Sequence, residues 1–225
     1  MAEPPRVPML QDVLLSTRVQ SWIRKANEQM AAIGYTEHGH RHASIVAKTA
    51  RRICLERGLS QRMAELAAIA GYLHDIGCMI HRTMHPQLGA ALAMRLLDEM
   101  GFDPDEIADV AAAIANHEEP EGVPITPMAA AVIIADKSDV HISRVQSTNP
   151  ADYDIHDMVN HACSQSRVVL SGPENPVIQL DLKIDTGEAS LMKYFEIFLD
   201  RMIMCRKAAA ELNAAFKLTI NDVEI

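Results

Sequence analysis

Apolar residues at helical spacing, interrupted at short intervals by residues that end or start helices, constrain the fold of this chain most. From residue 10 to residue 145, apolar side chains recur every three or four positions, which is the period of an amphipathic helix. Gly34, Gly58 and Gly101 follow such segments, whereas Ser60 and Asp103 precede others as N-cap residues. We therefore expect helices over residues 10–33, 42–57, 60–77, 86–100, 103–117 and 126–145.

The pattern changes towards the C-terminus. A short helix is expected over residues 154–166, before a link that contains glycine and proline. Residues 178–184 and 216–220 then alternate between apolar and polar, as half-buried strands do, and a long amphipathic helix over 188–213 separates them. Aromatic residues make up only 4% of the chain, which favours helices over a β-sandwich. The expected fold is mainly α, a helical bundle with a small C-terminal β-α-β appendage.

Composition excludes several classes of partner and location. The chain carries 21 basic and 30 acidic residues, a formal net charge of −9, which argues against binding to nucleic acid or to an anionic membrane. A small phosphorylated substrate stays compatible, because bound cations reverse the local field. The four cysteines form no C-x-x-C pair, and no leader or membrane-spanning run is visible. We expect a cytoplasmic protein with reduced thiols.

Six histidine and aspartate residues lie at or beside the ends of the expected helices: His42, His74, Asp75, His85, His117 and Asp136. Neutral imidazoles and carboxylates are ligands for divalent metal ions, and convergence from several helices is needed to surround one. Adjacent residues on a helix point about 100° apart, so His74 and Asp75 do not approach one ion symmetrically. Because a carboxylate can bridge two ions, the His74-Asp75 pair favours a binuclear centre.

The segments that carry these residues resemble the HD-domain (HDIG-type) metal-dependent phosphohydrolase superfamily. They read HRHASIVA around His42, HDIG at His74 and Asp75, HPQLGA from His85, NHEEPEG around His117 and ADKSD around Asp136. The resemblance spans residues 38–145. It implies that Asp75 bridges two metal ions, with His42, His74 and Asp136 on one and His85 and His117 on the other. It also implies three regions: an N-terminal arm and helix (1–33), the HD metal-dependent hydrolase domain (34–167) and a small α+β extension (168–225).

Two departures bear on the expected chemistry. Asn116 and the absence of a Gly-Tyr-Pro sequence after His117 distinguish the chain from the branch that hydrolyses cyclic dinucleotides. Cys78 stands where many members carry a phosphate-contacting lysine, so we expect Lys137, Arg144 or Arg82 to supply that charge. For Lys137 the alternatives are a solvated helix residue or a partner of Asp139, and for Arg144 the alternative is a structural salt bridge.

The resemblance implies hydrolysis of a phosphate ester or anhydride of a nucleotide or other small phosphorylated metabolite. Asp75, Lys137 and Arg144 are the expected catalytic residues, and a hydroxide bridging two divalent ions (Fe, Mn, Ni, Co or Zn) is the expected nucleophile. An HD-type mixed-valent di-iron oxygenase and a non-catalytic nucleotide-sensing module are the alternatives. The C-terminal extension is expected either to cover the site or to form the interface of a homodimer.

Overall fold

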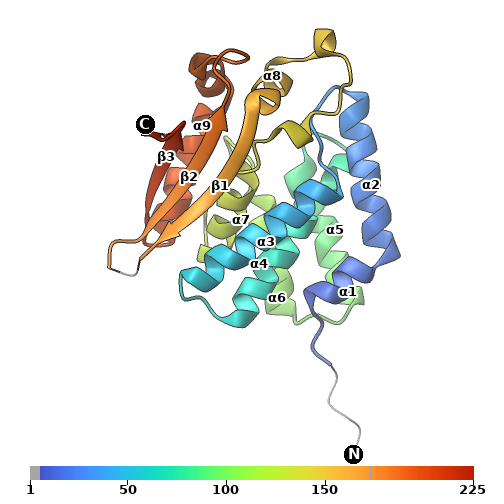
Figure 1. Cartoon of the computed structure of the whole chain (residues 1–225). Coiled ribbons are helices and arrows are strands. Elements are labelled where there is room, and N and C mark those ends of the chain that lie inside the picture. The colour runs from blue at the N-terminus through green and yellow to red at the C-terminus, as the bar shows by residue number, and fades with distance from the viewer. Residues whose placement is uncertain (1–5, 173) are drawn as a thin grey trace, which may run out of the picture.

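A computed structural model describes residues 6–172 and 174–225 of the chain (Figure 1). In chain order, the described helices are α1 (Leu10–Leu15), α2 (Thr17–Ala32), α3 (His40–Glu56), α4 (Gln61–Leu73), α5 (His85–Glu99), α6 (Pro104–Ala115), α7 (Pro127–Lys137), α8 (Ile155–Ala162) and α9 (Leu191–Glu211). Short 3-10 turns lie at η1 (Ile76–Met79), η2 (Ile142–Arg144) and η3 (Pro150–Asp152). The strands are β1 (Cys163–Ser171), β2 (Val177–Ile184), β3 (Ala215–Ile220) and β4 (Val223–Glu224). The predicted mainly α fold with a small C-terminal sheet is confirmed.

The helices α4 and α7 form the centre of the bundle. Every residue from Ala64 to Leu73 is buried in α4, and so is every residue from Met128 to Ala135 in α7. A helix that is apolar on all sides belongs in a protein core. Accordingly α4 packs against α3, α6 and α7, and α7 also packs against α3 and α9. The carboxyl ends of these two central helices carry the site residues described below.

Most helix boundaries follow the predicted capping residues. The hydroxyl of Ser60 accepts a hydrogen bond from the Met63 amide, and the Asp103 carboxylate accepts one from the Asp105 amide. These contacts satisfy backbone donors that a helix start otherwise leaves unpaired. Gly101 follows α5 with a φ of +79°, a conformation that glycine adopts without strain.

Several predicted helices are shorter than expected. The helix predicted over residues 60–77 ends at Leu73, before the His74-Asp75 pair, and two others break or end at a serine. The helix predicted over residues 10–33 is broken at Ser16, whose backbone is extended and whose hydroxyl caps α2. The helix predicted to run from residue 126 to residue 145 ends at Lys137. The Ser138 hydroxyl there donates to the Ala135 carbonyl, and the chain turns so that Asp139 reaches His42. In both cases a side chain offers the backbone a partner outside the helix.

The C-terminal sheet has the strand order β1-β2-β3-β4. Strands β2 and β3 are parallel and joined by α9, which confirms the predicted β-α-β unit. The helix predicted over residues 154–166 was wrong beyond Ala162, because β1 starts at Cys163 and pairs antiparallel with β2. Its Val168 pairs with Leu180, which in turn pairs with Leu218 of β3. This pairing between distant segments overrides the local helical pattern.

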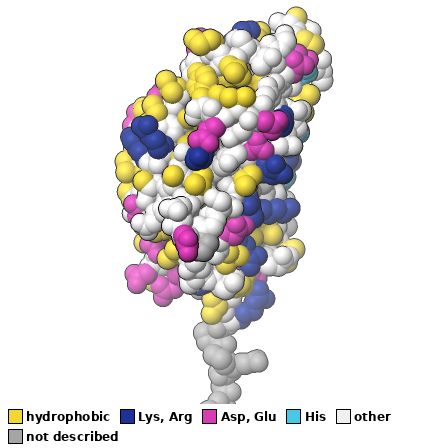
Figure 2. All heavy atoms as spheres, turned by 60° about the vertical axis from the view of Figure 1, so that its left-hand side comes forward, with side chains coloured by type: hydrophobic (Ala, Val, Ile, Leu, Met, Phe, Trp, Pro, Cys, Tyr) yellow, Lys and Arg dark blue, Asp and Glu magenta, His cyan; other side chains and the backbone are white. Residues whose placement is uncertain are grey.

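The sheet, α8 and α9 enclose a second apolar core, and α9 also reaches the core of the bundle. Figure 1 shows the sheet beside the helical bundle, with the ends of β1 and β2 projecting past it. The predicted boundary after residue 167 falls inside β1. On the side of the molecule that carries the sheet, acidic and basic side chains are interspersed with small groups of hydrophobic ones (Figure 2). Within the described residues, no helix is both long and apolar enough to cross a membrane.

Candidate metal centre

The six predicted ligands meet at the centre of the helical bundle. His42 lies in the first turn of α3, and His74 and Asp75 link α4 to η1. The remaining three come from the start of α5, the residue after the C-cap of α6, and the last turn of α7: His85, His117 and Asp136. All four imidazoles are at most 1% exposed, and both carboxylate side chains are 11% exposed. Several helix termini thus bring these nitrogen and oxygen donors into one buried cluster.

The first half of the cluster contains His42, His74 and Asp136. The Nε2 atoms of the two imidazoles lie 3.2 Å apart. Oδ1 of Asp136 lies 3.2 Å from Nε2 of His42 and 3.6 Å from Nε2 of His74. Three potential ligand atoms from α3, α4 and α7 therefore face one point.

The second half contains His85 and His117, whose Nε2 atoms lie 3.0 Å apart. Asp75 stands between the halves and divides its oxygens between them. Its Oδ2 lies 3.0 Å from Nε2 of His74, while its Oδ1 lies 3.3 Å from His85 and 3.8 Å from His117. This is the arrangement expected of a bridging carboxylate.

Hydrogen bonds at the opposite ring nitrogens orient the imidazoles. Nδ1 of His74 donates to the Gly71 carbonyl at 2.8 Å, and Nδ1 of His117 donates to the Ile114 carbonyl at 2.6 Å. Nδ1 of His42 donates to the Asp139 carboxylate at 2.7 Å. Since these partners only accept, each Nδ1 carries the proton and each Nε2 is left to bind a cation.

Charge in the cluster follows from burial and from close pairing. Burial raises the pKa of Asp75, but His74 and the other nearby imidazoles outweigh this effect and hold it well below its usual value. Burial also opposes the charge on His74, yet Asp75 and Asp136 raise its pKa to about 10. In the metal-free chain a proton on His74 therefore takes the place of a cation between the two carboxylates.

The donor set fits divalent metal ions. The Nε2 atoms of His42 and His74 lie 3.2 Å apart, a separation that requires either a proton or a metal cation between them. Overlapping groups of three donor atoms, each within 4.8 Å of one another, extend from Asp136 at one end to Glu118 at the other. Cys78 does not add a thiolate, because burial and then Asp75 raise its pKa far above its usual value. Imidazole and carboxylate donors suit Fe, Mn, Co, Ni and Zn.

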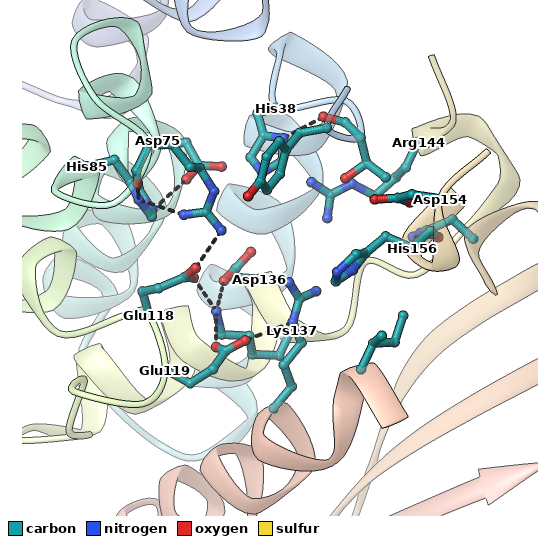
Figure 3. Close-up of a pocket in the computed structure, with 16 residues that line it drawn as sticks. His38, Asp75, His85, Glu118, Glu119, Asp136, Lys137, Arg144, Asp154 and His156 are labelled. Carbon is teal, nitrogen blue, oxygen red and sulfur yellow. Dashed lines mark hydrogen bonds and ion pairs between the residues drawn. The ribbon is translucent and has the colours of Figure 1, made fainter. Parts of the chain in front are cut away.

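A cavity opens directly beside the cluster (Figure 3). Asp75, His85 and Asp136 line it, and Glu118, Glu119 and Lys137 lie next to one another at its edge. The predicted catalytic residue Lys137 is 1% exposed, and its ammonium lies 2.8 Å from Asp136, 2.9 Å from Glu118 and 2.7 Å from Glu119. Burial by itself would lower the pKa of Lys137, but these carboxylates raise it. A fixed positive charge therefore borders the ligands.

Arg144, also predicted as catalytic, lines the same cavity but holds the backbone around it. Its Nε and one terminal nitrogen donate to the Glu37 carbonyl at 3.1 and 2.7 Å, and the other terminal nitrogen donates to the Asp139 carbonyl at 3.2 Å. Asp139 in turn orients His42 and pairs with Arg41. All three guanidinium nitrogens of Arg144 thus have partners, which gives it a positioning role.

His38 points into the cavity between Asp75 and Arg144 (Figure 3). Its Nδ1 donates to the Thr36 carbonyl at 2.6 Å, and burial lowers its pKa to about 3 despite the nearby Asp75. His38 is therefore neutral and offers an acceptor nitrogen rather than a proton.

Sequence reasoning missed several residues of the cavity. Asp139 carried a weak signal, because it follows the ligand Asp136 by three positions. Glu119 lies in the NHEEPEG segment with no role expected of it, yet it binds Lys137 and Arg201. His156 and Arg201 lie outside every motif, and only the packing of α9 against α7 brings Arg201 to the site.

Parts of this chain are similar to known proteins. Residues 39–140 match the HD domain family. An uncharacterized protein of Methanocaldococcus jannaschii is 27% identical over 220 residues, which cover 86% of this chain and 83% of that protein. A crystal structure of a predicted HD superfamily hydrolase from an uncultured Thermotogales bacterium is 25% identical, with a TM-score of 0.44 over 60% of this chain and 71% of that one. The matched segment, residues 39–140, contains all six clustered ligands.

Proposed function

We propose that the chain is a metal-dependent phosphohydrolase that cleaves a phosphate ester or anhydride of a small phosphorylated metabolite, with nucleotides among the candidates. One observation supports this most strongly. Asp75 presents one oxygen to each of two imidazole pairs, and the shared carboxylate lies at the wall of a cavity that basic side chains also line. Such a site pairs metal ligands with groups that attract anions.

The ligands would hold two divalent ions. His42, His74, Asp136 and one oxygen of Asp75 would bind the first, and His85, His117 and the other oxygen of Asp75 would bind the second. Ions at these positions supply Lewis acidity towards phosphoryl oxygens and lower the pKa of water. The Nδ1 hydrogen bonds keep each imidazole in the orientation that this requires.

Lys137 and Arg82 are the basic side chains whose charge would act on the phosphoryl group. The Lys137 ammonium lies 2.8 Å from Asp136, so its charge is held beside the ligands. Arg82 lies over the Tyr35 ring and pairs with Glu118 at 2.7 Å, which leaves its buried Nε without a protein partner. Fixed positive charges offset charge on phosphoryl oxygens without reorganisation.

Elemental analysis of freshly purified protein, combined with a phosphate-release screen, tests this proposal. Manganese, iron and cobalt would be added back in turn to a panel of nucleotides and sugar phosphates. We expect two ions per chain and phosphate release. Asp75→Asn should lose both together, whereas Asp98→Asn, which alters an exposed carboxylate on α5, should lose neither. Wild-type turnover in Asp75→Asn would contradict the proposal.

The same screen separates hydrolysis from the oxygenase alternative, because histidine and carboxylate ligands suit iron in either chemistry. An oxygen electrode would follow each reaction. Phosphate release under nitrogen supports hydrolysis, whereas oxygen consumption that depends on substrate, with no phosphate released under nitrogen, would replace it with the oxidative reaction.

A further inference from the structure

One wall of the cavity is formed by residues from the C-terminal part of the chain. Ile197 and Arg201 of α9 line the cavity, together with Asp154, His156 and Asn160 from the start of α8 and from α8 itself. All of these residues lie beyond residue 140, where the family match ends. Residues outside the segment that matches the HD domain family therefore form one side of the pocket.

A chain of ion pairs connects this wall to the metal ligands. Asp136 contacts Lys137 at 2.8 Å, Lys137 contacts Glu119 at 2.7 Å, and Glu119 contacts Nε of Arg201 at 2.9 Å. Arg201 thus lies beyond both Lys137 and Glu119 as one moves away from Asp136. Lys137 is the cation in contact with the ligand Asp136, and Arg201 lines the same cavity at the other end of this chain of ion pairs.

The guanidinium of Arg201 is held in place and has hydrogen-bond donors free for a ligand. Only its Nε is used, by Glu119, and its central carbon lies 4.8 Å from the centre of the Phe198 ring, which fixes the plane of the group. Among the described residues, neither terminal nitrogen of Arg201 has an acceptor within hydrogen-bond distance. Arg144, by contrast, has a partner for every guanidinium nitrogen. Two parallel donors on a held guanidinium match the two oxygens of a carboxylate or a phosphate.

The rest of the cavity is also suited to charged ligands. Ile197 is the one aliphatic side chain among the described lining residues, and the aromatic surface comes from Tyr35, His38, His85 and His156. Burial, followed by Arg201, lowers the pKa of His156, so this neighbour of Arg201 adds no second positive charge. Among its described lining residues the site therefore offers, in Arg201, a cation with two unused terminal nitrogens, and little apolar area for a hydrophobic group.

We propose that Arg201 binds a second anionic group of the substrate, a phosphate or a carboxylate, while the phosphoryl group to be cleaved lies at the metal ligands. The proposal rests on the phosphohydrolase function proposed above and narrows its substrates to small phosphorylated metabolites with two anionic groups. It assigns specificity to α9, outside the HD domain. Cleavage itself stays with the ligands and Lys137.

Calorimetry with inert phosphonates tests this assignment without turnover. The manganese-loaded protein would be titrated with methylphosphonate, which has one anionic group, and with diphosphonates whose groups are separated by one to three methylene units. 3-Phosphonopropionate would test a carboxylate as the second group. We expect at least one doubly anionic probe to bind about 10- to 100-fold more tightly than methylphosphonate, the usual effect of charge-assisted hydrogen bonds. The tighter class of probe identifies the second group as phosphate or carboxylate.

Variants on α9 complete the test. Arg201→Gln should bring the ratio between doubly and singly anionic probes close to one, and Arg201→Lys, which keeps the charge but not the fork, should leave an intermediate ratio. Arg206→Gln, which alters an exposed arginine on the same helix, should leave the ratio unchanged. Melting temperatures would verify folding, and Arg201→Lys serves alone if Arg201→Gln does not fold.

Two results would overturn the proposal: no preference for any doubly anionic probe in the wild type, or an equal loss of affinity for all probes in the Arg201 variants. Failure of the proposed function looks different. An Arg201-dependent preference in a protein that releases phosphate from no ester would retain this binding site and reject the hydrolase.

Discussion

Gly77 lies where η1 meets the start of α5, so closely that a Cβ atom there would lie 2.1 Å from the His85 carbonyl oxygen and 2.6 Å from the Gly89 amide nitrogen. Cβ atoms in proteins essentially never approach other heavy atoms within 3.0 Å. Because both contacts are with backbone, no rotamer change relieves them. Gly77→Ala should therefore push η1 and α5 apart by about 1 Å.

That displacement is large for a metal site. Metal–ligand distances tolerate only about ±0.2 Å, and His85 sits on the part of α5 that must move. His42, His74 and Asp136 come from other helices and stay in place. We expect Gly77→Ala to lower metal content from two ions per chain towards one. Overpacking of about 1–3 kcal/mol should lower the melting temperature by about 2–12 °C for a chain of this size.

The assay is elemental analysis after buffer exchange, with thermal melts of the same samples. Gly172→Ala is the matched control, because a Cβ there meets nothing within 4 Å. Gly89→Ala should have a smaller effect, since its nearest contact, with the His74 carbonyl, is 3.1 Å. Two ions and an unchanged melting temperature in Gly77→Ala would refute the reasoning that this close approach sets the position of His85.

Three further outcomes follow from the charges and burial in the structure. The pKa of His74 is raised to about 10, so its protonation stabilises the metal-free fold fully below pH 6.5 and less as the pH rises towards 10. Metal affinity, measured by calorimetry, should therefore rise between pH 6.5 and pH 10. An affinity that does not change over this interval would contradict the competition between the proton and the metal. Lys137→Met should destabilise the metal-free protein by about 3–5 kcal/mol in urea melts, because it leaves buried carboxylates unpaired; the exposed Lys48→Met should not, and equal effects would be evidence against the ion-pair cluster. Burial raises thiol pKa values, so a thiol reagent at pH 8 should label the folded protein slowly and the unfolded protein fully at Cys54, Cys78, Cys163 and Cys205; rapid labelling of the folded form would contradict their burial.

The metal cluster could be predicted from the sequence because each ligand sits beside a strong local signal. His74 and Asp75 follow a capped apolar helix, and Asp136 ends another. Local patterns do not show that these residues lie close together in space. That expectation came from the order of the five segments along the chain, which resembles the order in the HD-domain family. The same local signals set most helix boundaries, since capping residues act on the amides two or three positions away.

The remainder depends on contacts between distant segments. The first residues of strand β1, up to residue 166, were predicted as helix, and the pairing of β1 with β2 decides their conformation instead. Arg201 looked like any charged residue of an amphipathic helix, and it reaches Glu119 only because α9 packs against α7. Arg144 is the opposite case: it lies near a motif, but its guanidinium donates hydrogen bonds to backbone carbonyls.

Anomalous diffraction from crystals of the manganese-loaded protein tests most directly whether Asp75 bridges two metal ions. We expect two peaks, one beside Oδ2 of Asp75 near His42 and His74, and the other beside Oδ1 near His85 and His117. A single peak on one side of Asp75, or peaks that do not contact its carboxylate, would contradict this bridging role.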